Sequence, residues 1–133
     1  MDVIAALQLV QVYEFNDSET GKTYYWNATK GYDLAIARNA TPHQVYPADF
    51  GMTAARIREM YPDLDEQKAL NLPDSALKSP LLFVEHRQKH VLCDGWHRLY
   101  KAVRQGRAWL PAYVLTAFES ARIECGGPDG RPL

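Results

Sequence analysis

The feature that most constrains this chain is an apolar run that ends at Asp94-Gly95 and passes at once into a helical pattern. Val91-Leu92-Cys93 is apolar and β-prone, and apolar residues then recur on one face of residues 96–103 until Gly106 ends the pattern. The chain is therefore expected to run from a strand through a tight turn into an amphipathic helix.

Such a turn is a candidate anion site. The first backbone N–H groups of a helix have no partner inside it, and the helix dipole adds partial positive charge there. Gly95 would let a ligand approach the backbone without a Cβ in the way, Arg98 adds a planar cation and His97 a further donor. The pattern predicts a phosphate site. It equally allows a structural interpretation, in which Asp94 caps the helix and the other polar side chains are solvated.

The rest of the chain predicts two β-hairpins with helices around them. The first pairs residues 7–15 with 22–26, and the second pairs residues 81–84 with 91–93 across a tight polar loop. Further elements are a turn at 27–31, a strand or helical turn at 32–38, a short strand at 42–46, a helix at 49–61 stopped by Pro62, a short helix within 63–79, a strand at 109–115, a short helix at 118–123 and a frayed tail at 126–133.

The run from Val91 to Ala102, with the second hairpin before it and Leu110-Pro111-Ala112-Tyr113-Val114 after it, resembles the ParB/sulfiredoxin superfamily. In that family a hairpin leads into such a turn, then a helix, then a strand with a proline near its start. The resemblance implies an α+β fold with a small mixed β-sheet and helices, here preceded by an N-terminal β-hairpin. One domain, residues 1–133, is expected, with an N-terminal β extension (1–41), a family-like core (42–118) and a C-terminal tail (119–133).

The resemblance also implies a function. Members of the family bind nucleotides at this turn, CTP in partition proteins and ATP in sulfiredoxin, and some are described as nucleases or nucleotide hydrolases. By that likeness Gly95, His97 and Arg98 correspond to phosphate-contacting positions. With their neighbours Trp96 and Lys101 they form the predicted phosphate- or nucleotide-binding set. If the chain is a phosphohydrolase, its predicted catalytic residues are Asp94, chosen for its position beside the turn, and His97, with Mg²⁺ as a companion of the phosphates and its ligands unassigned. We expect His97 and Arg98 to carry ligand affinity rather than fold stability.

Two departures from the family narrow the function. Trp96 stands where sulfiredoxins have a reactive cysteine, and Cys93 lies on the strand side of the turn, so peroxiredoxin repair is not expected and Cys93 should be inert. Partition proteins continue into a helix-turn-helix domain, whereas this sequence ends at Leu133, so a centromere-clamp role is not expected of this chain alone.

Other polar residues offer alternatives. Besides Asp94, a metal ion or attacking water could be held by acidic or imidazole groups near the turn or on the preceding helix, namely Asp49, Glu59, Glu85, His86 and His90. A basic stripe invites a nucleic-acid interface, although a solvated helix face explains such a stripe more often. The stripe is Arg98, Lys101, Arg104 and Arg107, with Trp96, Tyr100 and Trp109 as stacking surfaces.

Composition limits these choices. The 133 residues include 15 basic and 16 acidic side chains, a formal net charge of -1, which lacks the positive field of a stand-alone duplex-DNA binder. No apolar run approaches a membrane span and no signal sequence precedes the first hairpin, so a soluble cytoplasmic protein with no membrane partner is predicted. Three hypotheses remain: a nucleotide-binding protein with or without hydrolysis, a non-catalytic module that binds a protein partner or a second copy around a structural anion, and a toxin-like or mobile-element protein acting on nucleic acid.

Overall fold

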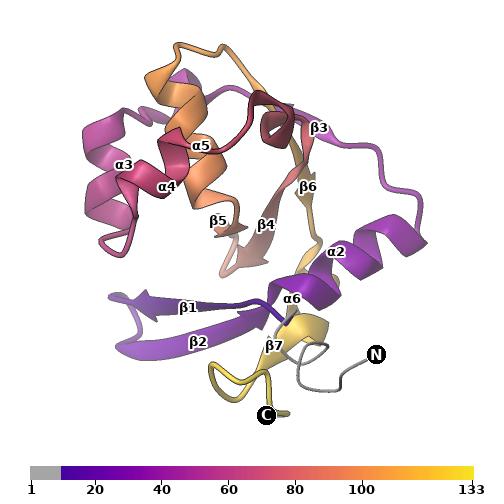
Figure 1. Cartoon of the computed structure of the whole chain (residues 1–133). Coiled ribbons are helices and arrows are strands. Elements are labelled where there is room, and N and C mark those ends of the chain that lie inside the picture. The colour runs from indigo at the N-terminus through magenta and orange to yellow at the C-terminus, as the bar shows by residue number, and fades with distance from the viewer. Residues whose placement is uncertain (1–9) are drawn as a thin grey trace, which may run out of the picture.

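Residues 10–133 are described by the computed structural model, and within them seven strands form two separate sheets (Figure 1). One sheet is antiparallel with the order β1-β2-β7. The other has the order β3-β6-β4-β5 and is mixed, because β4 and β6 run parallel while its other pairs are antiparallel. The strands are β1 Val12–Asp17, β2 Lys22–Asn27, β3 His43–Val45, β4 Leu81–His86, β5 Lys89–Asp94, β6 Leu110–Val114 and β7 Glu124–Cys125.

Short helices surround these sheets, and most begin at a polar cap. The side chains of Asn27, Thr53, Asp65 and Thr116 each accept a backbone N–H of the first turn of the helix they precede. Helix α5 differs, because its cap residue is Gly95 and no side chain caps it. The α-helices are α2 Ala28–Ala37, α3 Ala54–Met60, α4 Glu66–Leu70, α5 Trp96–Arg104 and α6 Ala117–Ile123, and the 3₁₀ helices are η1 Pro47–Phe50 and η2 Asp74–Lys78.

The structure confirms the α+β class, both hairpins, the strands β3 and β6, and the helices α5 and α6. Three local predictions are wrong. The turn expected at residues 27–31 is instead the start of helix α2, and of the two alternatives open for residues 32–38 the helical one is found; the buried face of α2 consists of Ala28, Gly31 and Ala35. The single helix expected over residues 49–61 is divided, because Gly51 ends η1 in the left-handed region at φ 64°. Residues 126–133, expected as a frayed tail, fold back on themselves, because the amide of Gly126 donates to the carbonyl of Arg131 at 2.7 Å. The part of the first hairpin predicted at residues 7–9 lies outside the described residues.

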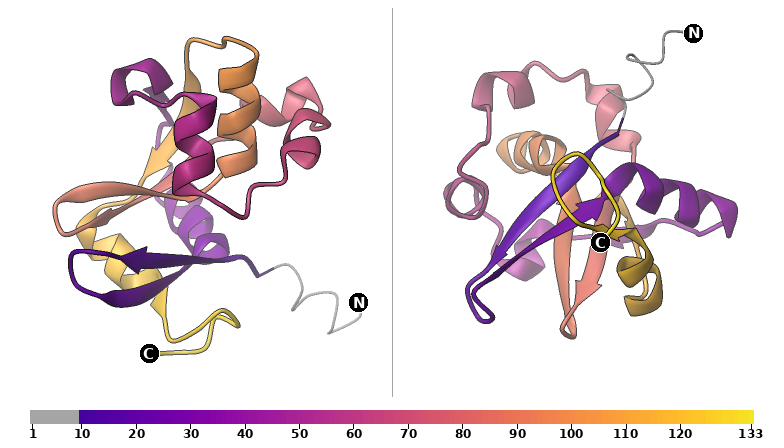
Figure 2. Two further views of the ribbon diagram at one scale, coloured as in Figure 1. Left: turned by 90° about the vertical axis from the view of Figure 1, so that its left-hand side faces the viewer. Right: turned by 90° about the horizontal axis from the view of Figure 1, so that it is seen from below.

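The two hairpins extend toward the same side of the molecule, with their tips close together (Figure 2). Trp26 from the first hairpin and Leu82 from the second belong to one buried cluster, and α5 covers a second cluster built on Tyr100 and Leu110. Tyr13 of β1 contacts both clusters. The first hairpin is thus part of the core rather than an appendage to it. No helix within residues 10–133 is both long and apolar enough to cross a membrane.

Candidate functional site

The turn between β5 and α5 is built on Gly95. Its φ of 106° lies in the left-handed region, which a residue with a Cβ adopts only at a cost. A Cβ at this position would also stand 2.4 Å from Cδ2 of Leu81 and 3.0 Å from Nη2 of Arg98. Glycine is therefore required by close contacts within the chain itself, and not only by the approach of a ligand.

Arg98 is directed back at its own chain. Its Nη1 donates to the carbonyl oxygens of Ser79 and Pro80, each at 2.9 Å, and its Nη2 donates to the hydroxyl of Tyr32 and to Oδ2 of Asp94, each at 2.9 Å. These four bonds occupy both terminal nitrogens of the guanidinium group. The planar fork that the sequence assigns to phosphate is thus engaged in tying the start of α5 to α2 and to the segment before β4.

Asp94 does not cap α5. Its carboxylate accepts the hydroxyl proton of Tyr32 at 2.8 Å and the guanidinium proton of Arg98. Burial, followed by the charge of Asp94, raises the pKa of Tyr32 well above its usual range, so this hydroxyl remains a donor. Tyr32 comes from the extension that the resemblance does not cover, and no local pattern in the sequence connects it with the turn.

His97 contributes an acceptor rather than a donor at one ring nitrogen. Its Nε2 accepts the backbone N–H of Asp65 at 3.2 Å, and Tyr61 lies edge-on to the ring with the two centroids 6.0 Å apart. Because Nε2 is occupied by this bond, it cannot also take a proton from a water molecule. Burial, followed by the charge of Lys68, lowers the pKa of His97 below its ordinary value of 6.5.

This shift predicts a pH dependence. A histidine that binds a proton less readily in the folded chain than in the unfolded chain contributes stability above about pH 6.5, and that stability is lost as the pH falls. We expect the free energy of unfolding of the wild type to drop more between about pH 7.5 and about pH 5.5 than that of His97→Gln, which cannot titrate. Urea denaturation of both proteins at the two pH values measures this. An identical drop in both would contradict the prediction.

The other two residues of the predicted binding set are buried. The indole of Trp96 is 5% exposed, donates to the carbonyl of Leu92 at 3.2 Å and stacks on Tyr61 with the centroids 5.3 Å apart. Lys101 is also 5% exposed, and its ammonium group donates to the carbonyl of Leu72 and pairs with Asp74 at 3.3 Å. Lys101 thus satisfies carbonyl groups that follow α4, and its charge is directed into the protein.

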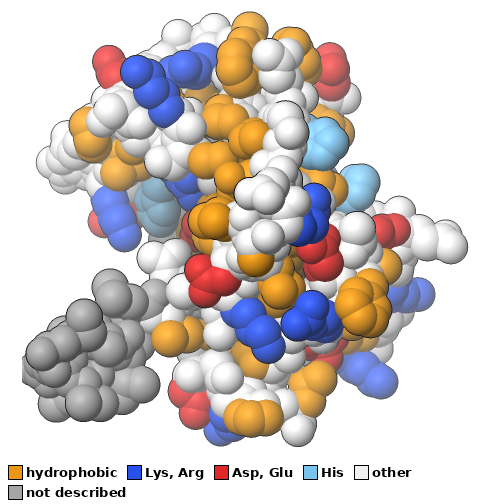
Figure 3. All heavy atoms as spheres, turned by 90° about the vertical axis from the view of Figure 1, so that its right-hand side faces the viewer, with side chains coloured by type: hydrophobic (Ala, Val, Ile, Leu, Met, Phe, Trp, Pro, Cys, Tyr) orange, Lys and Arg blue, Asp and Glu red, His pale blue; other side chains and the backbone are white. Residues whose placement is uncertain are grey.

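The predicted basic stripe is largely neutralised within the chain. Besides Arg98 and Lys101, Arg104 is paired with Glu66 at 2.7 Å and donates to the hydroxyl of Tyr100 at 2.9 Å. Tyr100 is fully buried, so its ring cannot stack on a base. Figure 3 looks onto the side of the molecule opposite α3 and α5, where basic, acidic and apolar side chains are interspersed. These contacts give no support to a nucleic-acid interface along α5.

The expected inertness of Cys93 fits its position, since it is 3% exposed and burial raises the pKa of its thiol far above the ordinary value.

In the part of the chain that the structure describes, no group of three or more His, Cys, Asp or Glu side chains is placed to hold a metal ion. One of the alternative candidates, His86, is instead hydrogen-bonded to Asp17 of the first hairpin at 2.9 Å. No local pattern in the sequence indicates this pair, because 69 residues separate its members.

A concave feature of the described residues adjoins the turn. A cleft of about 620 Å³ lies between β1, η1, the end of α3 and the outer strand β5. Its lining is mainly apolar and aromatic and includes Tyr13, Phe15, Phe50, Met60, Tyr61 and Trp96. Trp96, which lines the cleft, is also the first residue of α5, whose start has no side-chain cap. The sequence located the turn but not the cleft, whose lining comes from several separate segments.

Comparisons with known proteins leave the chain without an assigned relative: no family model, no curated protein and no solved structure matches it.

Proposed function

We propose that this chain binds a nucleotide, with the base in the cleft and the phosphates at the start of α5. The observation that carries the proposal is the position of Trp96, which lines the cleft and opens the helix. A cleft of about 620 Å³ falls within the size range of small-ligand sites, which typically combine apolar walls with a few polar groups. The likeness of the turn to the ParB/sulfiredoxin superfamily supports the same ligand class.

The phosphates would be held chiefly by backbone N–H groups. The first turn of α5 has no side-chain cap, so those donors and the helix dipole face whatever lies above Gly95. Arg98 and Lys101 already bond to the chain and would add little without leaving their partners. Affinity is therefore expected to be modest and to depend on both the base and the phosphates.

Binding without turnover fits the site better than hydrolysis. A general base needs a free acceptor near the attacking water. The carboxylate of Asp94 accepts from Tyr32 and Arg98, and Nε2 of His97 accepts from the backbone of Asp65. Nε2, the acceptor nitrogen of His97, is thus occupied, and on Asp94 both bonds fall on Oδ2.

A thermal-shift screen tests the proposal. ATP, CTP, GTP and UTP are compared with their nucleosides and with inorganic triphosphate, each with and without Mg²⁺. A ligand at about 100 times its Kd stabilises the protein by about 2.7 kcal/mol. We expect at least one nucleotide to raise the melting temperature more than its nucleoside or triphosphate does. No shift with any compound would contradict nucleotide binding.

A pair of variants locates the site. Phe50 lines the cleft and is 63% exposed, whereas Phe118 is 73% exposed and lies on α6 away from the cleft. Phe50→Ser should weaken nucleotide binding severalfold without lowering the melting temperature of the free protein, because little buried surface is lost. Phe118→Ser is the matched control and should leave binding unchanged. Equal effects of the two substitutions would place the ligand elsewhere.

One observation favours a second candidate, a module that binds an extended peptide. Strands β1 and β5 are the outer strands of their sheets, and consecutive residues of each, Val12–Asn16 and Lys89–Leu92, line the cleft. Outer strands offer free backbone groups that can pair with an added strand. Two results together would support this candidate instead. The protein would bind none of the nucleotides, and an extended apolar peptide would slow the hydrogen exchange of backbone amides in β1 and β5.

A further inference from the structure

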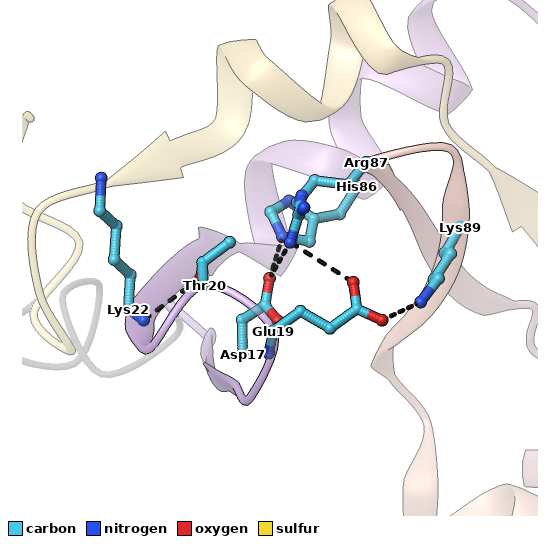
Figure 4. A network of polar contacts seen from close by, with 7 residues as sticks. All are labelled: Asp17, Glu19, Thr20, Lys22, His86, Arg87 and Lys89. Carbon is cyan, nitrogen blue, oxygen red and sulfur yellow. Dashed lines mark hydrogen bonds and ion pairs between the residues drawn. The ribbon is translucent and has the colours of Figure 1, made fainter.

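The tips of the two hairpins are joined by polar side chains from both sides (Figure 4). Nε2 of His86 lies 2.9 Å from Oδ2 of Asp17, and Arg87 lies 3.6 Å from the same carboxylate. Arg87 also lies 3.4 Å from Glu19, which pairs with Lys89. In the described residues no strand pairing joins the two sheets, so the hairpins meet only through side chains, and these are the polar contacts among them.

The inner contact of this group is shielded from water. The ring of His86 lies among Phe15, Tyr24 and Trp26, at centroid distances of 5.8, 4.4 and 5.4 Å, and its side chain is 13% exposed. The hydrogen bond from His86 is the main reason that the pKa of Asp17 is lowered to about 2. The carboxylate is therefore ionised at neutral pH, and Nε2 of His86 is the donor.

The outer contacts are of another kind. Glu19, Arg87 and Lys89 are 52%, 47% and 65% exposed. Ion pairs this exposed are weak and are screened by salt, whereas the shielded pair of Asp17 and His86 is not. The tips are thus held by one salt-resistant contact surrounded by salt-sensitive ones.

The backbone between β4 and β5 is strained where these contacts are made. Arg87 and Gln88 have φ values of 52° and 66°, in the left-handed region that two-residue hairpin turns normally fill with asparagine or glycine. Strain of this kind persists where the surroundings hold it in place, and it is common at moving or binding segments. Arg87, one of the two strained residues, is also the residue that pairs with Asp17 and Glu19 of the first hairpin.

The tips lie at one end of the cleft. A smaller cavity of about 240 Å³ beside Asp17 and His86 shares Phe15, Asn16, Lys89 and Val91 with the cleft lining. The opposite end of the first hairpin is fixed, because β2 pairs with β7 and leads directly into α2. The tip is therefore the end of the hairpin that can move without breaking a sheet.

We propose that Asp17, Glu19, His86, Arg87 and Lys89 form a latch that sets the width of the cleft, and that releasing it opens the cleft between Phe15 and Val91. In the latched state a ligand in the cleft could reach little of the side chains at its base, because Trp96 is only 5% and Leu99 only 4% exposed. Opening the cleft would expose them to a ligand. The latch is a property of the free protein and does not depend on which ligand the cleft takes.

Hydrogen exchange on the full chain without ligand tests the latch. His86→Phe keeps a ring among the three aromatic side chains but removes the bond to Asp17. We expect amides of residues 15–22 and 86–91 to exchange at least about tenfold faster in this variant, with α5 and α6 unchanged. Glu59→Gln is the control, since Glu59 is a 69% exposed carboxylate on α3 that pairs with Arg56.

A milder perturbation covers the case in which His86→Phe does not fold. Glu19→Gln removes only the exposed contacts, and it should speed exchange at both tips about twofold to threefold, as should about 0.5 M salt in the wild type. Unchanged exchange at the tips in Glu19→Gln and in high salt would overturn the proposal. A uniform increase over the whole chain would also overturn it, because it would show general destabilisation. Both readouts are obtained whether or not any nucleotide binds.

Discussion

Replacing Gly95 with alanine is expected to lower the free energy of unfolding by about 3 kcal/mol or more. A φ of 106° is strained for any residue with a Cβ, at a cost of order 1–3 kcal/mol. The added Cβ would stand 2.4 Å from Cδ2 of Leu81, which is fully buried and has no room to retreat. Overpacking of this kind adds about 1–3 kcal/mol. Urea denaturation of the wild type and the variant measures the sum.

Two other glycines distinguish the stability lost through backbone strain from the stability lost through a close contact of the added Cβ. Gly21 and Gly106 both have φ near 71°, and a Cβ built on either would meet nothing within 4 Å. Gly21→Ala and Gly106→Ala should each cost only the strain, about 1 kcal/mol. If Gly95→Ala lowers the free energy of unfolding no more than these two substitutions do, the added Cβ does not meet Leu81 as closely as the structure indicates.

Replacing Arg98 with alanine is expected to lower the free energy of unfolding by about 3 kcal/mol, even in the absence of any ligand. The substitution leaves the carbonyl group of Ser79 without its donor, and it leaves the carboxylate of Asp94 and the carbonyl group of Pro80 to share the single hydroxyl proton of Tyr32. Side chains of the pair are only 16% and 27% exposed, so water replaces the lost bonds incompletely. Arg98→Lys should recover only part of the loss, because an ammonium group cannot reproduce the four-bond fork.

The control for Arg98 is an arginine whose ion pair is exposed. Arg56 is 57% exposed and pairs with Glu59, so Arg56→Ala should change stability by no more than about 0.5 kcal/mol. The double variant Asp94→Asn with Arg98→Ala should lose less than the sum of the two single losses, because the two residues share their bonds. A fully stable Arg98→Ala protein with lost nucleotide affinity would instead support the ligand role predicted from the sequence.

The expected loss of stability in Arg98→Ala replaces the role predicted from the sequence, in which Arg98 carries ligand affinity rather than fold stability. The sequence shows an arginine in the first turn of a helix after a glycine turn, which is the position of a phosphate ligand, and that pattern says nothing about internal partners. Its partner Tyr32 lies 66 residues away, in an extension whose structure the local pattern left open. Lys101 behaves in the same way. Its position on the helix after the turn predicts a phosphate contact, but the fold buries it and pairs it with Asp74, which no local pattern in the sequence indicates.

Helix α2 shows why the local pattern was insufficient there. Its sequence contains glycine and a β-branched threonine, which weaken helix propensity, and its buried face is made of small residues rather than a large apolar stripe. The spacing of Ala28, Gly31 and Ala35 is helical and was the available signal. Close contact of this face with Leu82 and α6 stabilises the helix, and such contact is a tertiary effect.

What the sequence determined by itself is local: two hairpins, the glycine turn at residue 95, the amphipathic helix after it and its end at Gly106. Alternation, periodicity and turn chemistry act within a few residues, so they can be inferred without knowing where the chain goes next. Only the tertiary structure decided that Arg98 and Lys101 bond inward, that His86 meets Asp17, and that several segments line a cleft beside the turn. A charged side chain takes its partner from whichever segments the fold brings within hydrogen-bond distance, and no local pattern in the sequence specifies those segments.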